Sequence, residues 1–218
     1  MGLGLVLSRE GLCCGSPINK PKEHPMERAE LVRRFAHALV ALAPIYYLLP
    51  VDLPYVGFRR WVLLIVFISA MFVFESVRIW KKWTFLGLRP HETGRLASHA
   101  WAAAGLVLVL WLFPHDIASA AIVGWALVDP FMGILRGTKL ARSSVVAFSC
   151  MAYFVLAVAM LVLWGERPIL EMAVLSGVGM AVAIPAEWFK IPRVDDDFLM
   201  SVLPALVMMA LSLVIAEL

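Results

Sequence analysis

Residues 117–135, IASAAIVGWALVDPFMGIL, decide the fold of this chain. The stretch is long enough to cross a hydrocarbon core of ~30 Å as a helix, which rises ~1.5 Å per residue. Asp129 is the charged side chain within it, about two helical turns from Arg136. A carboxylate inside a membrane span is energetically expensive and marks a functional site by default. The stretch therefore predicts a membrane helix that carries chemistry.

Six further apolar stretches flank this one, and we interpret each as a helix: Phe35–Pro50, Trp61–Phe74, Leu96–Phe113, Ser144–Trp164, Ile169–Pro185 and Phe198–Ile215. The chain is 62% hydrophobic and 16% charged, whereas a soluble domain averages roughly 45–50% and about 25%. The stretches lack the two-residue alternation of barrel strands, and helices satisfy their own backbone hydrogen bonds in lipid. The predicted fold is an all-α, polytopic transmembrane helix bundle of about seven spans. The stretch Trp61–Phe74 is short, so it either extends into its flanks or forms a re-entrant arm.

The basic residues are divided unequally between the two sides of this predicted bundle. The side that holds the N-terminal tail carries 16 of the 19 Lys and Arg residues, and the other side carries only Arg59, Arg60 and Arg167. The positive-inside rule then places the N-terminus in the cytoplasm, and an odd number of spans places the C-terminus outside. We expect a multi-pass protein of the cell membrane, with the lipid bilayer as a partner and no nucleic-acid partner. The oligomeric state does not follow from the sequence.

Residues 1–25 do not resemble the rest of the bundle. They combine a short apolar start, the Cys13–Cys14 pair and a Pro/Lys-rich stretch, without the features of a signal peptide. We predict a disordered extension or an over-extended gene start, with Met26 as the initiator. Residues 26–218 then form a single transmembrane catalytic domain.

Most other polar residues gather at the predicted cytoplasmic boundary: Glu30, Arg33, Arg34, His37, Glu75, Arg78, His91, Glu92, Arg95, His99, Arg136, Lys139, Arg142, Glu187, Lys190, Arg193 and Asp195–Asp197. A transporter would place polar groups near mid-membrane and often show repeated halves. Polar groups at one interface instead suit an enzyme that joins a soluble reactant to a lipid head group. A small transporter is the non-enzyme alternative.

The first polar group follows one helix face. Glu30, Arg33, Arg34 and His37 are spaced i, i+3, i+4 and i+7. Snorkelling at the interface would explain the two arginines. It explains His37 less well, because an unbroken apolar run follows that residue.

The second group surrounds Asp129. Pro130 cannot donate to the Ala126 carbonyl, so the helix opens locally. Gly133 and Arg136 follow on the Asp129 face, and this stripe would hold a metal and a phosphate. The structural alternative is a buried Asp129–Arg136 pair that bridges helices.

The third group is the triple carboxylate Asp195–Asp197, with Glu187 ending the preceding helix. We expect Asp197 to cap the last helix, and the surplus carboxylates suit a hard divalent cation. Two further segments stay open between function and structure. The first is the 136–143 loop, which either clamps phosphates or contacts anionic lipid. The second comprises Glu75, Arg78 and the His91–Arg95 segment, which have either a functional or a structural role.

Three of these motifs, in this order, resemble the polyprenol kinase family of dolichol kinases, phytol kinases and CTP-dependent diacylglycerol kinases. Glu30-Leu-Val-Arg33-Arg34-Phe-Ala-His37 is similar to the family's E-x-x-R-[KR]-x-x-H start. Val128-Asp129-Pro130 with Gly133 is similar to its G-D-[PT]…G segment. Glu187 followed by Val194-Asp195-Asp196-Asp197 is similar to its E…[LV]-D-D-N element. Val128 replaces the usual Gly and Asp197 the usual Asn, which affects the predicted approach of nucleotide and the metal coordination.

The resemblance implies a kinase that transfers the γ-phosphate of CTP, with Mg²⁺, to an isoprenoid alcohol at the cytoplasmic interface. The enzyme alternative is a CTP-dependent cytidylyltransferase acting on a lipid phosphate. We predict metal ligands among Asp129, Asp195, Asp196 and Glu187. Nucleotide binding is assigned to Arg33, Arg34, Gly133, Arg136 and Lys139. Catalytic roles are assigned to Glu30, His37 and Asp129, with the base being His37 or one of the aspartates.

Overall fold

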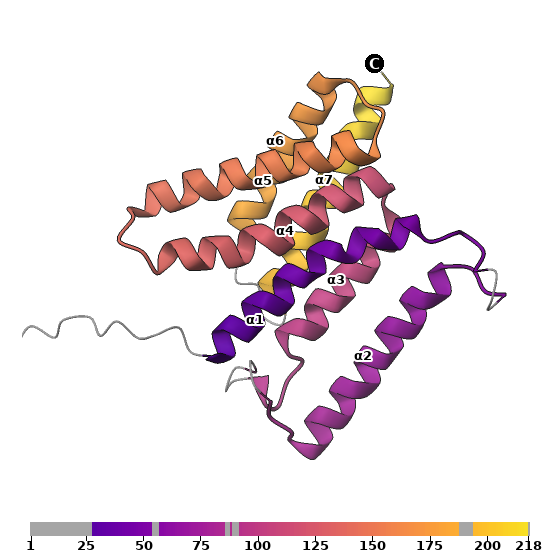
Figure 1. The fold of residues 1–218 in the computed structure, drawn as a ribbon, viewed down its shortest axis with the longest axis vertical. Helices are drawn as coiled ribbons and strands as arrows, with labels where there is room; N and C mark the ends of the chain where they lie inside the picture. Colours follow the sequence, from indigo (N-terminus) through magenta and orange to yellow (C-terminus); the bar gives the residue numbers. More distant parts are fainter. Residues whose placement is uncertain (1–27, 54–56, 86–87, 89–91, 188–193, 218) are drawn as a thin grey trace, which may run out of the picture.

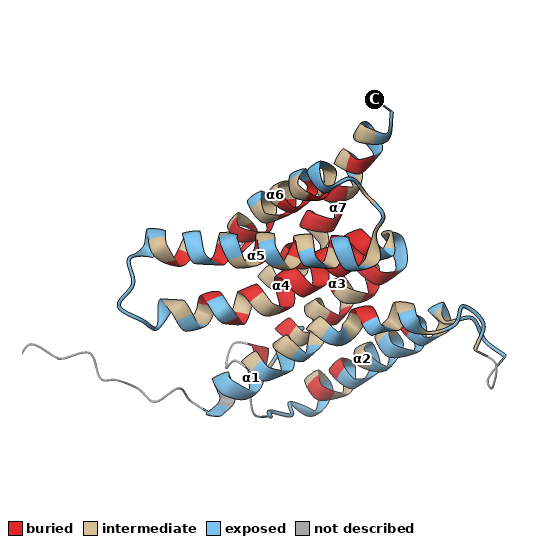
Figure 2. Cartoon of the chain, turned by 45° about the horizontal axis from the view of Figure 1, so that its top comes forward, coloured by how far each residue is buried: buried red, intermediate tan, exposed pale blue. Residues whose placement is uncertain are grey.

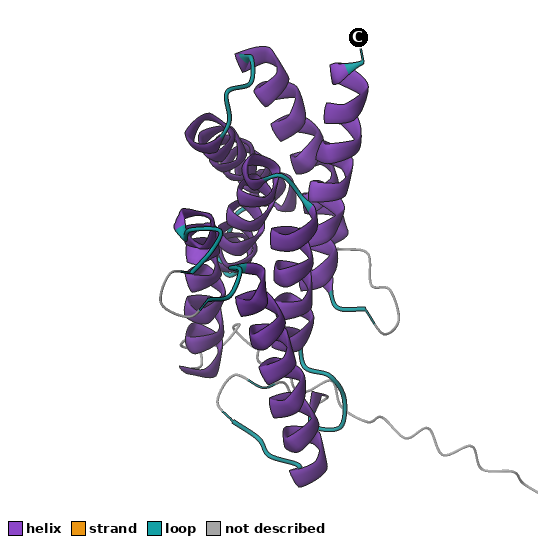
Figure 3. Ribbon diagram, turned by 90° about the vertical axis from the view of Figure 1, so that its right-hand side faces the viewer, coloured by secondary structure: helices purple, strands orange, loops and turns teal. Residues whose placement is uncertain are grey.

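The computed structural model describes residues 28–53, 57–85, 88, 92–187 and 194–217. Within these ranges the chain forms helices and loops without a strand (Figure 3). The elements are α1 Arg28–Leu39, the 3₁₀ helix η1 Val40–Leu48, α2 Trp61–Lys81, α3 Ser98–Leu112, α4 His115–Arg136, α5 Arg142–Trp164, α6 Ile169–Ala186 and α7 Asp196–Ala216. The predicted all-α bundle is confirmed. The prediction for residues 1–25 lies outside the described residues.

Six helical segments are long and apolar enough to cross a membrane: Glu30–Leu48, Trp61–Lys81, His115–Arg136, Arg142–Trp164, Ile169–Ala186 and Asp196–Ala216. The remaining apolar helix, Ser98–Leu112, has 15 residues. At ~1.5 Å per residue it is about 22 Å long, short of the ~30 Å hydrocarbon core. The chain is therefore a multi-pass membrane protein with six full-length candidate spans and one shorter helix. The placement of the N-terminus in the cytoplasm and of the C-terminus outside stays a prediction.

The second predicted stretch is longer than its apolar run. α2 does not end at Phe74 but continues to Lys81, and it includes the buried side chains of Glu75 and Arg78. These two side chains bond to each other, with Arg78 Nε donating to Glu75 Oε2 at 2.7 Å. Because the charges compensate each other, the helix continues through them and reaches 21 residues, long enough to cross a membrane.

The first span changes its helix type along its length. α1 passes directly into η1, and Pro44 lies inside η1. Proline lacks the N–H that an α-helix would use at this point, which favours the tighter 3₁₀ winding. The segment begins at Arg28, earlier than the predicted Phe35, so Glu30 and both arginines belong to the helix.

α4 is the central element of the bundle. It contacts α1, η1, α3, α5, α6 and α7, lies between α5 and α1 in Figure 1, and is the most deeply buried candidate span, at 72%. Figure 2 shows its buried residues along the middle of the molecule. Gly124 permits close packing with α5, because a Cβ there would lie 2.6 Å from the Tyr153 ring. α4 therefore carries Asp129 on a rigid, buried helix.

Candidate functional site

A cavity of about 830 Å³ lies at the end of the bundle where α1, α5 and α7 begin and α4 and α6 end. Its walls combine charged and apolar side chains: Glu30, Arg33, Arg34, His37, Asp129, Pro130, Met132, Gly133, Arg136, Leu140, Arg142, Val145, Val146, Glu187 and Asp196. The polar side chains come from helices that are far apart in the sequence. The bundle thus gathers most of the predicted site residues around one hollow.

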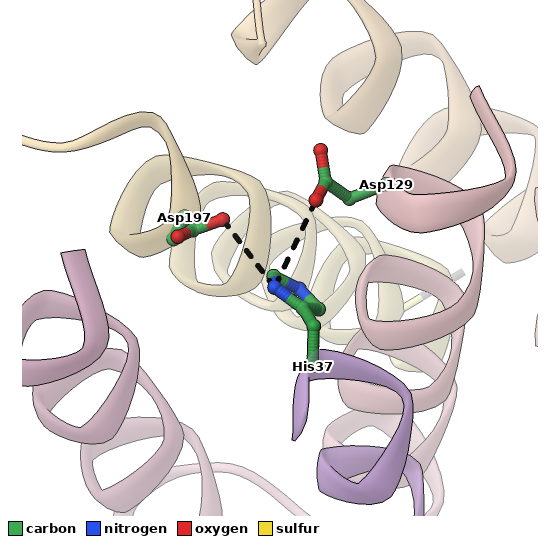
Figure 4. A group of neighbouring side chains, drawn as sticks. All are labelled: His37, Asp129 and Asp197. Atoms are coloured by element: carbon green, nitrogen blue, oxygen red, sulfur yellow. Dashed lines mark ion pairs between the residues drawn. The ribbon is translucent and has the colours of Figure 1, made fainter. Parts of the chain in front are cut away.

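The centre of the site is a cluster of His37, Asp129 and Asp197 (Figure 4). His37 Nδ1 lies 3.7 Å from Asp129 Oδ2 and 3.8 Å from Asp197 Oδ1. One ligand atom from each residue lies within 4.8 Å of the others. The side chains are only 10%, 22% and 17% exposed. Two carboxylates thus converge on one imidazole in a largely buried place, which is an arrangement suited to a cation.

His37 is held in position by α4. Its ring packs edge-on against Trp125, with the ring centroids 4.7 Å apart. Trp125 is fully buried and lies one helical turn before Asp129. One face of α4 therefore fixes both the imidazole and a carboxylate that faces it. The helix continues through Pro130 to Arg136, so any opening at the Ala126 carbonyl is local.

Gly133 lies beside an arginine of α1. A Cβ at this position would lie 3.4 Å from Arg34 Nη2 and 3.6 Å from Arg34 Cζ. The guanidinium group of Arg34 also donates to Glu30 Oε1. The Arg34 cation therefore lies beside α4 at the cavity wall.

The structural alternative, an Asp129–Arg136 pair, is wrong, because Arg136 pairs elsewhere. Arg136 Nη1 donates to Glu187 Oε1, and within the described chain no ion pair joins Arg136 to Asp129. Burial raises the pKa of Glu187, and nearby Asp129 and Asp196 add to this, although the Arg136 guanidinium opposes the shift. Glu187 Oε2 is buried and has no hydrogen-bond partner among the described residues. Arg136 thus stabilises the end of α6 and leaves Asp129 to His37.

The triple carboxylate is used differently from the prediction. Asp195, not Asp197, is the N-cap of α7, and its side chain accepts a hydrogen bond of 3.2 Å from the backbone N–H of Asp197. The expectation that Asp197 caps is wrong because α7 begins at Asp196, two residues before the apolar run that starts at Phe198. The shift frees the Asp197 carboxylate for the cluster with His37. Three adjacent carboxylates were the only sequence signal for this role.

Some predicted residues lie away from the cavity wall. Lys139 is exposed and does not line the cavity, and Asp195 does not line it either. Arg142 of the same loop does line it, although the sequence did not single it out from its neighbours. His91, Lys190 and Arg193 lie outside the described residues.

Glu75 and Arg78 form a buried clamp rather than a part of this cavity. Arg78 Nη2 donates to the backbone carbonyls of Glu92, at 3.2 Å, and Arg95, at 2.5 Å. Glu75 Oε1 accepts from the backbone N–H of Ala97 at 2.6 Å. The pair therefore ties the segment before α3 to the end of α2, which accounts for both charges structurally.

No family model matches the chain, and no match was found among curated proteins or solved structures.

Proposed function

We propose that the chain is a membrane-embedded lipid-alcohol kinase that transfers the γ-phosphate of CTP to an isoprenoid alcohol of the dolichol, polyprenol or phytol type at the cytoplasmic interface. One observation carries the proposal: a cavity at one end of a membrane bundle combines carboxylates, guanidinium groups and an apolar wall. Its volume of about 830 Å³ lies in the range of small-molecule sites, ~300–1,000 Å³.

The guanidinium groups suit a triphosphate. Arg33, Arg34, Arg136 and Arg142 all line the cavity. Arginine binds phosphate through a planar fork of donors and keeps its charge when partly buried. Phosphoryl transfer depends mainly on positioning and on compensating the charge of the transferred group. These arginines therefore supply the contacts that such a reaction needs.

The carboxylates suit Mg²⁺, which prefers oxygen ligands and is usually bound by one or two carboxylates plus substrate phosphates. Asp129 and Asp197 are the acidic members of the central cluster, and Asp196 lines the cavity beside them. When bound there, the ion would neutralise charge on the β- and γ-phosphates. Asp195 and Glu187 stay predicted ligands, although Asp195 already caps α7 and Glu187 pairs with Arg136.

The alcohol would enter on the apolar side of the cavity. Leu140, Val145 and Val146 form a wall at the start of α5, with Pro130 and Met132 of α4 beside it. The hydrocarbon chain would lie along this wall, which places the hydroxyl near the central cluster. The alcohol oxygen then forms a bond to the γ-phosphorus, the bond to the β-phosphate oxygen breaks, and CDP leaves. The hydroxyl proton passes to His37 or to a neighbouring aspartate.

The test uses two radiolabelled forms of CTP with purified protein, Mg²⁺ and mixed micelles. With a polyprenol acceptor, label from [γ-³²P]CTP should enter the lipid phase, while label from [α-³²P]CTP should appear in CDP. With a polyprenyl phosphate acceptor, cytidylyl transfer would instead bring the α-label into lipid and release pyrophosphate. No transfer with any acceptor, together with solute flux in reconstituted vesicles, would favour the transporter and reject both enzymes.

A further inference from the structure

A second cavity, of about 460 Å³, lies at the opposite end of the bundle. Its walls include Tyr46, Tyr47, Trp61, Trp111, Trp164 and the cation Arg60. The same elements define both ends: α5 begins at the first cavity and ends at Trp164, and the segment that starts with α1 ends at η1. The two cavities are therefore separate sites at the two ends of the spans.

The aromatic side chains pack around this hollow in an ordered way. The rings of Tyr46 and Tyr47 meet edge-on with centroids 5.3 Å apart, and Tyr47 meets Trp164 at 6.3 Å. The Tyr47 hydroxyl donates to the Leu110 carbonyl of α3 at 3.1 Å. Aromatic residues are common at membrane interfaces, but here Tyr47 is hydrogen-bonded to α3 and the rings line a cavity.

Arg60 is a cation without an acidic partner in this cavity. Its guanidinium carbon lies 5.4 Å from the Tyr46 ring centroid and 5.7 Å from that of Tyr47. Its Nη1 donates to the carbonyls of Tyr47 and Leu49, both at 3.2 Å. Among the described residues, no carboxylate forms an ion pair with it. A guanidinium group that lies beside a hydrocarbon phase and has no counter-ion favours an anionic ligand.

The neighbouring cations differ in this respect. Arg59 pairs with Asp52 at 3.9 Å on the surface, and Arg167 bonds to Asp116 and Glu171. Among the described arginines of this end, Arg60 is thus the one that pairs with no carboxylate. Trp61 and Trp111, both exposed, present apolar surface at the same cavity, which suits an amphiphile better than a free anion.

We propose that this second cavity binds the phosphate of a phospholipid, with Arg60 contacting the phosphate and the aromatic rings contacting the glycerol and the first methylene groups. The ligand class follows from a cation and aromatic walls at a membrane interface. This site is independent of the kinase proposal, since none of its residues line the first cavity.

The test measures lipid retention by native mass spectrometry of the full chain in detergent, titrated with phosphatidylglycerol. We expect one molecule of phosphatidylglycerol to bind more tightly than any further molecules. Arg60→Gln should weaken this binding about tenfold or more, as expected for the loss of a charge-assisted contact. Arg59→Gln is the matched control and should bind as the wild type does. Arg60→Lys keeps the charge and should recover part of the binding, whereas a purely structural role would make both variants equally poor.

Further measurements address the source of the phosphate and the folding of the variants. Diacylglycerol, which lacks the phosphate, should bind far more weakly than phosphatidylglycerol, and millimolar inorganic phosphate should not displace the lipid. Equal binding of diacylglycerol, or full displacement by inorganic phosphate, would overturn the proposal. So would wild-type affinity in an Arg60→Gln sample whose helicity and monodispersity match the wild type.

Discussion

Asp129→Asn is the most informative single substitution in this chain, because asparagine nearly preserves the shape of the side chain and removes its charge. If Asp129 holds Mg²⁺ in the central cluster, kinase turnover should fall by orders of magnitude. A bound metal supplies several kcal/mol of transition-state stabilisation, and each ~1.4 kcal/mol lost is about tenfold in rate.

The expected effect on stability follows from the geometry of the cluster. Ligand atoms of Asp129, Asp197 and His37 lie within 4.8 Å of one another. At that separation and an effective dielectric constant of ~20, two carboxylate charges repel each other by about 3.5 kcal/mol. Without metal or nucleotide, the variant should therefore melt at the wild-type temperature or a few degrees above it.

The same substitution at the other end of α4 is the control. Asp116 is buried and accepts from Arg167 Nε at 2.6 Å. Asp116→Asn should weaken that pair and lower the stability by roughly 1–3 kcal/mol, while folded molecules keep near-normal turnover. Melting temperature and turnover are measured on the same detergent-purified sample of each variant. A destabilised but fully active Asp129→Asn protein would refute the metal assignment and most of the case for phosphoryl transfer.

Three further predictions test the site and the packing. Arg142→Ala should raise the KM for CTP at least several-fold more than Lys139→Ala, since only Arg142 lines the cavity; equal effects would contradict this. Because burial raises the pKa of Glu187, its contribution to folding is fully present below its unfolded pKa of about 4.5 and is lost as the pH rises through its folded pKa. The stability of Glu187→Gln relative to wild type should therefore increase from about pH 4.5 upward. A difference in melting temperature that does not change with pH would contradict this prediction. Gly124→Ala should lower the stability by about 1–3 kcal/mol, because its Cβ would meet Tyr153 at 2.6 Å. Gly177→Ala, which has nothing within 4 Å, should be neutral or stabilising in the same thermal unfolding measurement.

The sequence predicted the helices well where hydrophobicity is unbroken and less well where charges are buried. The apolar run ends at Phe74, before Glu75, whereas α2 continues to Lys81. A composition pattern does not reveal that Arg78 and the backbone N–H of Ala97 satisfy that carboxylate. The first apolar run likewise begins at Phe35, whereas α1 begins at Arg28, because the charged first turn of this helix lies at the cavity instead of in lipid.

In the candidate site, too, the sequence predicted positions along one helix better than contacts between helices. Helical spacing correctly indicated that Glu30 and His37 face one region, which is now the cavity wall. Spacing along one helix does not reveal partners on other helices. The alternative pair of Arg136 with Asp129 lies on one helix, whereas Arg136 bonds to Glu187 at the end of α6. The role of Asp197 depends on α7 beginning two residues before the apolar run, which makes Asp195 the N-cap.

The two ends of the bundle distinguish structural charges from candidate functional ones. At one end, Arg167 joins Asp116, Glu171 and the Ser212 hydroxyl, so the network closes on itself. At the other end, Asp129 and Asp197 share a single imidazole as their described ion-pair partner. Carboxylates buried with so little compensation are energetically unfavourable in the protein alone. They become favourable when a cation joins them, which is why the cluster around His37, and not the network around Arg167, is the place to look for chemistry.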